Sequence, residues 1–88
     1  MATSDNEAFA AFGRRIIRAH ARRVADGDIE GLAELVKLRD AVDEATRDAV
    51  RGLRSEPWCY SWADIARVLG VSTPAAWERW RDRDERTG

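Results

Sequence analysis

Residues 60–80, YSWADIARVLGVSTPAAWERW, limit the possible folds of this chain more than any other segment. Ser61 and Asp64 have the S-x-x-D spacing of a capping box, in which the two residues satisfy free amides at a helix start. This spacing predicts a short helix over 62–69. Gly70 follows directly, and glycine is suited to the left-handed backbone that ends a helix. The segment therefore begins with a short helix and a tight turn.

A second short helix is expected immediately after the turn. Ser72 or Thr73 can cap its first amides, and Pro74 is acceptable in a first helical turn. Ala66 is small enough to let two helices cross closely. The side chains expected to face inward are those of Ile65, Ala66, Leu69, Val71, Ala76 and Trp80. Together these features predict a helix-turn-helix over 60–83.

Two longer helices are expected before this motif. A capping box formed by Ser4 and Glu7 predicts a helix that begins at Asp5. The Asp-Gly-Asp sequence at 26–28 predicts the end of that helix, and its second Asp is suited to cap the next one. The following apolar stripe predicts a helix over 29–55. Two helices joined by so tight a turn are expected to lie antiparallel.

The expected fold is therefore all-α, with four helices in a single domain, 1–88. A long antiparallel helical hairpin over 4–56 precedes the helix-turn-helix, and Pro57 ends the hairpin because it disfavours helical geometry at the residue before it. Trp58, Tyr60 and Trp62 are expected to form core where the hairpin meets the motif.

Charge is distributed unevenly along this chain of net charge -1. Residues 8–25 contain five arginines and no acid, residues 28–48 seven acids and three bases, and residues 56–86 six acids and five arginines. The arginines opposite the apolar face of the first helix are Arg14, Arg15, Arg18 and Arg22. They can contact DNA phosphates, meet the acidic helix of another subunit, or stay solvated. Arg39 and Asp43 are expected to form an ion pair along the second helix.

Residues 60–80 resemble the C-terminal helix-turn-helix of small regulatory proteins from actinobacteria and their phages. In that family an aromatic-Ser-Trp-Ala-acid-Ile opening leads to Leu-Gly-Val-Ser and Ala-Ala-Trp. The resemblance extends over roughly 38–80, because such proteins often precede the motif with a helix like LRDAVDEATRDAVRGLR. It implies sequence-specific DNA binding, usually by a transcriptional regulator. The family commonly has Arg-Gln after the Ser, where this chain has Thr73-Pro74, so this chain lacks an arginine that could bind phosphate or guanine there.

Docked conventionally, the second helix of the motif, about 73–82, lies in the major groove of double-stranded DNA. Glu78 can accept from a cytosine amino group, although a surface charge paired with Arg81 is the preferred interpretation. The residues of the motif expected to contact DNA are Ser72, Thr73, Pro74, Trp77, Glu78, Arg79 and Arg81. The arginines of the first helix named above complete the expected interface. A single such unit contacts few base pairs, so a homodimer joined through the apolar faces of the long helices is expected.

Other classes of function have little support in the sequence. It contains no nucleophile–base pair, phosphate-binding glycine loop or metal-ligand cluster, so we expect no enzyme, cofactor, metal or small-molecule substrate. No apolar run reaches the length of a membrane span, which predicts a cytoplasmic protein, nucleoid-associated when bound to DNA. The alternative function is a protein-interaction module, for instance a phage or plasmid regulator that docks on a host factor and uses the motif as scaffold.

Overall fold

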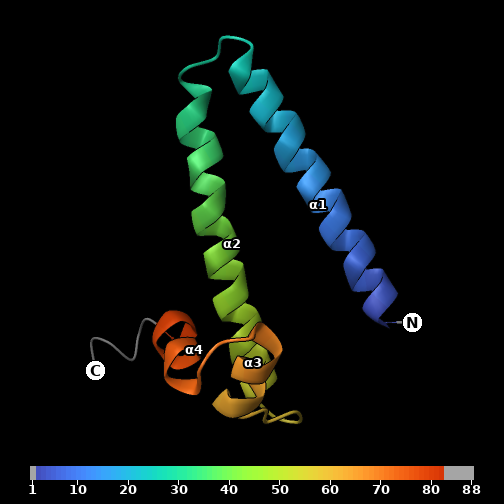
Figure 1. Cartoon of the computed structure of the whole chain (residues 1–88), viewed down its shortest axis with the longest axis vertical. Coiled ribbons are helices and arrows are strands. Elements are labelled where there is room, and N and C mark those ends of the chain that lie inside the picture. Colours follow the sequence, from blue (N-terminus) through green and yellow to red (C-terminus); the bar gives the residue numbers. More distant parts are fainter. Residues whose placement is uncertain (1, 83–88) are drawn as a thin grey trace. The chain divides into compact units, whose positions relative to one another are not determined.

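The computed structural model describes residues 2–82, and all regular secondary structure in this range is helical. The helices are α1 (Ala2–Ala25), α2 (Gly31–Arg54), α3 (Trp62–Leu69) and α4 (Thr73–Trp80) (Figure 1). The expectation of an all-α chain with four helices is confirmed for this range. None of these helices combines the length and apolar character that a membrane crossing requires.

The chain divides into two compact units, Met1–Asp40 and Ala41–Gly88. Unit 1 contains α1, the connection after it and the beginning of α2. Unit 2 contains the rest of α2 together with α3 and α4. The long helix α2 therefore contributes to both units.

Within unit 1, α1 begins at Ala2 rather than at the predicted Asp5, so Ser4 lies inside the helix. The side chain of Ser4 is outside the described part of the structure, and its predicted cap with it. Gly27 has a φ of 124°, which confirms the left-handed turn expected after α1. The backbone amide of Gly31 donates to Asp28 Oδ1 at 3.0 Å, so Asp28 caps α2 as predicted. The helix starts two residues later than expected because this bond fixes its first turn at Gly31.

Within unit 2, three predicted helix ends are confirmed. The Ser61 hydroxyl accepts from the Asp64 amide at 3.1 Å, and Asp64 accepts from the Ser61 amide at 3.1 Å, which is a complete capping box. Gly70 takes the left-handed conformation with φ 72°, and the Val71 amide donates to the Ala66 carbonyl. The Ser72 hydroxyl then accepts from the Ala75 amide at 3.2 Å, so α4 begins as predicted. The predicted motif boundary at residue 83 lies outside the described residues.

The core of unit 2 is small and consists of Val50, Ile65, Ala66 and Ala76. Ala66 and Ala76 have exposed fractions of 2% and 0%, and α3 and α4, the helices that contain them, are in contact. The prediction that Leu69 and Val71 face inward is wrong, because both are exposed. Helices of only eight residues bury little beyond their crossing point, and these two side chains lie at the end of α3 and in the turn after it.

The aromatic residues between α2 and α3 also differ from expectation. Trp58 and Tyr60 are exposed rather than part of a core. The segment is fixed through its backbone instead, since the Tyr60 amide donates to the Leu53 carbonyl at 2.9 Å. Trp62 is half-buried, and the Arg54 guanidinium lies 4.9 Å from the centroid of one of its rings.

Candidate nucleic-acid interface

The start of α4 presents an exposed polar surface. Ser72, Thr73 and Pro74 are all exposed at the N-terminal end of the helix, while Ala76 on the opposite side is fully buried. The Ser72 hydroxyl oxygen accepts from the backbone within the cap, and this leaves its proton free to be donated to another acceptor. The Thr73 hydroxyl and the free amides of the first turn lie beside it. This end of α4 can therefore donate hydrogen bonds to an approaching acceptor.

Further along α4, Trp77, Glu78 and Arg81 form a cluster. The Arg81 guanidinium lies 4.5 Å from the Trp77 ring centroid, and its Nη2 is 3.9 Å from Glu78 Oε1. Glu78 is thus paired with Arg81, as the preferred interpretation of the sequence expected, and its role toward DNA stays a prediction. Only 18% of the Arg81 side chain is exposed, so most of its surface is already in contact with the protein. Trp77 itself remains 39% exposed.

The side chain of Arg79 is hydrogen-bonded to α2. Its Nη2 donates to both carboxylate oxygens of Asp43 at 3.1 Å, and its guanidinium lies 4.4 Å from the Trp80 ring centroid. The predicted pair of Arg39 with Asp43 is wrong, because Asp43 accepts from Arg79 instead. A guanidinium held on an aromatic ring is pre-organised for a carboxylate, whereas an exposed pair along one helix gains little.

Two further hydrogen bonds join the end of α4 to α2. Arg47 Nη2 donates to the Arg79 carbonyl at 3.3 Å, and Arg51 Nε donates to Asp82 Oδ2 at 3.2 Å. Arg79 of α4 and the α2 residues Arg47 and Arg51 thus connect α2 with the end of α4. The sequence predicted that Arg79 binds phosphate and did not indicate that Arg79 contacts α2.

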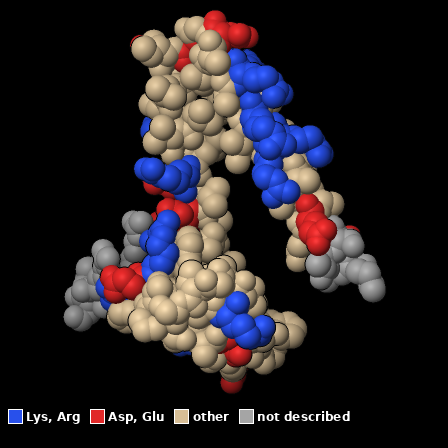
Figure 2. Space-filling view, viewed as in Figure 1, with Lys and Arg blue, Asp and Glu red and all other residues tan. Residues whose placement is uncertain are grey.

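The arginines of α1 have a different environment. Arg14, Arg15, Arg18 and Arg22 are all exposed, and no salt bridge involves them in the described part of the chain. Figure 2 shows their positive surface running along α1. Arg15 also lies 5.7 Å from the Phe12 ring centroid. The structure therefore keeps this stripe as unpaired positive charge on unit 1, and it places the predicted residues of α4 together on unit 2.

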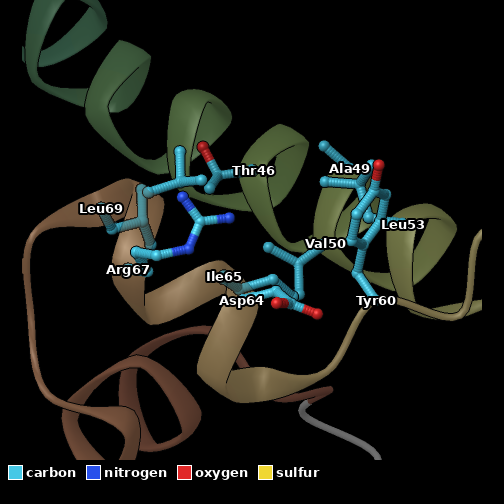
Figure 3. A pocket seen from close by; sticks show the side chains of 10 residues that line it. Thr46, Ala49, Val50, Leu53, Tyr60, Asp64, Ile65, Arg67 and Leu69 are labelled. Atoms are coloured by element: carbon cyan, nitrogen blue, oxygen red, sulfur yellow. The ribbon is translucent and has the colours of Figure 1, made fainter.

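Unit 2 also has a groove between α2 and α3 that was not predicted from the sequence (Figure 3). Its volume is about 400 Å³. It is lined by Thr46, Ala49, Val50, Leu53, Tyr60, Asp64, Ile65, Arg67, Val68 and Leu69. One overlooked feature of the sequence could have indicated this groove. Val68 and Leu69 are apolar and follow the buried Ile65 and Ala66, so α3 is apolar on more than one side.

Asp64 is the acidic residue of this groove. Hydrogen bonds from the backbone and side chain of Ser61 lower the pKa of Asp64 below its ordinary value of 3.8, and the nearby Arg67 charge lowers it further. A carboxylate that accepts such bonds is favoured in its charged form. Asp64 therefore remains ionised near neutral pH, and its bonding capacity is largely used in the cap of α3.

The described residues contain no group of three His, Cys, Asp or Glu side chains that could hold a metal ion. Comparison with protein-family models, with curated proteins and with solved structures found no match to this chain.

Proposed function

We propose that this protein binds double-stranded DNA sequence-specifically through a helix-turn-helix formed by α3 and α4, as a transcriptional regulator. The observation that carries the proposal is the contact between two short helices that are joined through the left-handed Gly70 and in which Ala66 and Ala76 are buried. This arrangement leaves the N-terminal end of α4 exposed, which is the part of a recognition helix that reaches base edges in the major groove.

Base and backbone contacts would come from the exposed side of α4. The hydroxyls of Ser72 and Thr73 are donors for phosphate or base edges, and Pro74 can contact a thymine methyl group. Trp77 is exposed one turn further on and would lie against the groove wall or the sugar-phosphate backbone. Glu78 forms an ion pair with Arg81, so we expect Glu78 to orient the Arg81 side chain rather than to bind a base.

Phosphate neutralisation would come mainly from α1. Much of the affinity of a DNA-binding protein depends on cations that displace condensed counterions. Arg79 and Arg81 are engaged with Asp43 and Glu78, whereas the α1 arginines have no such partners among the described residues. We therefore assign the principal phosphate contacts to Arg14, Arg15, Arg18 and Arg22.

A homodimer is part of this proposal, because one helix-turn-helix reads too few base pairs for good specificity. Two copies would read two half-sites on the nucleoid DNA of the cytoplasm. The protein-interaction alternative requires no contact between α4 and a nucleic acid, and this difference is directly measurable.

The test is the salt dependence of binding to duplex DNA, measured by fluorescence anisotropy. Replacing Arg14 and Arg18 with Ala should reduce the slope of log Kd against log salt by about 1 for each phosphate that the variant no longer neutralises. The control variant removes the same charge at Lys37, which is paired with Glu34, and at Arg39, which is exposed on α2 outside the proposed interface. An equal change of slope in both variants would contradict the assignment of the phosphate contacts to α1.

A further inference from the structure

Two apolar surfaces of this protein have no covering partner in the described structure. The first is the apolar face of α1, formed by Phe9, Phe12, Ile16 and Ile17, whose exposed fractions run from 39% to 73%. No described residue of unit 1 is buried. Apolar side chains gathered on one helix face are normally covered by another element or another protein.

The second surface is the groove between α2 and α3 in unit 2. Its exposed walls are Leu53, Tyr60, Val68 and Leu69, with exposed fractions from 42% to 74%. Figure 3 shows Leu53 and Tyr60 at one end of the groove and Leu69 at the other, with Val50 and Ile65 between them. Apolar side chains thus line both the α2 side and the α3 side of the groove, and the charged residues Asp64 and Arg67 lie on the α3 side.

We propose that the apolar face of α1 in one copy of the protein binds in the α2–α3 groove of a second copy, and that the contact is reciprocal. The spacing of Phe9, Phe12 and Ile16 is that of the anchors with which an amphipathic helix occupies a groove. This inference supplies the interface of the dimer in the proposed function. The self-association it describes takes place without DNA.

The areas of the two surfaces match. Each exposes the equivalent of about two complete large side chains, which is roughly 300–400 Å² at about 150–200 Å² per side chain. In a reciprocal dimer each copy contributes both surfaces, or roughly 700 Å² of apolar area, close to the approximately 800 Å² per partner of a stable interface. Either surface alone would provide only about half of that area.

The charges are compatible with this contact. Residues 8–25 carry five arginines and no acid, whereas residues 41–82 carry seven acids and six arginines. Glu44 and Asp48, on the part of α2 that leads into the groove, have exposed side chains. The two segments therefore carry net charges of +5 and -1, so no overall repulsion opposes the contact. Its main arginine stripe lies on the side opposite the apolar face and stays available for phosphates.

Sedimentation velocity over a range of protein concentrations, without DNA, tests the proposal. The wild-type protein should dimerise, and Phe12→Asp and Val68→Asp should each weaken the dimer about 100-fold, because each substitution impairs both reciprocal halves of the interface by about tenfold. An equimolar mixture of the two variants should associate more tightly than either variant alone, because one intact face then meets one intact groove and the second substitution adds little to a contact that is already disrupted. Val71→Asp is the control, because Val71 is exposed in unit 2 and does not line the groove.

Tryptophan fluorescence shows whether the variants stay folded, since all four tryptophans lie in unit 2. A wild-type protein that is monomeric at every concentration would overturn the proposal. Unimpaired dimerisation of Val68→Asp would also overturn it, because α1 would then bind a different surface. A dimer that does not bind DNA would leave this interface standing and contradict only the proposed function.

Discussion

The turn between α3 and α4 gives a prediction that separates backbone strain from packing. Gly70 has a φ of 72°, and a Cβ placed there would meet no heavy atom within 4 Å. The only cost of Gly70→Ala is thus the left-handed conformation, about 1 kcal/mol for an L-residue. Gly52 provides the matched control, since it lies within α2 and its Cβ would also meet nothing within 4 Å. Alanine there should stabilise the helix by about 0.5 kcal/mol, the lower end of the usual gain.

The two variants should therefore differ by about 1.5 kcal/mol in the free energy of unfolding, with opposite signs relative to wild type. Urea unfolding followed by tryptophan fluorescence measures this difference, because the four tryptophans and both glycines lie in unit 2. If Gly70→Ala were as stable as wild type, the left-handed turn would be absent. If both substitutions changed the free energy of unfolding in the same direction, the placement of Gly52 within a helix would be contradicted.

Three further predictions concern unit 2. Ala76→Leu should destabilise it by about 1–3 kcal/mol through overpacking, while Thr73→Leu on the exposed side should have a much smaller effect in the same urea assay. The pKa of Asp64 is lowered in the folded state, so its contribution to stability is present above about pH 4 and is lost as the pH falls through the folded pKa. Asp64→Asn should accordingly reduce the loss of stability in acid; an unchanged acid unfolding profile would contradict the cap. A double-mutant cycle of Asp43→Asn and Arg79→Gln should give a coupling of about 0.5 kcal/mol, since the pair is partly exposed, and no coupling would contradict it.

The helix ends of unit 2 could be predicted from the sequence because each depends on residues a few positions apart. Each of these helix ends is capped by residues within one turn of it, namely Ser61 with Asp64, Gly70, and Ser72. The contact between α3 and α4 was also predictable, because the small side chains of Ala66 and Ala76 allow two helices to approach each other closely. Local chemistry thus determines most of the arrangement around the start of α4.

The partners of long charged side chains could not be predicted in the same way. Asp43 had an acceptable partner four residues away in Arg39, yet it accepts from Arg79, 36 positions later in the chain. That choice depends on how α4 lies on α2, which no local pattern contains. For the same reason the sequence could not show that Leu69 forms the wall of a groove.

Binding of the purified protein to duplex fragments of random genomic DNA, titrated over a range of salt concentrations, tests the central claim most directly. If α3 and α4 form a DNA-binding unit, the protein should bind a subset of fragments with an affinity that falls steeply with salt. Gly70→Ala, which strains the turn before α4, should weaken that binding more than Gly52→Ala. Failure to bind any fragment in a salt-dependent manner would contradict the claim that these two helices bind DNA.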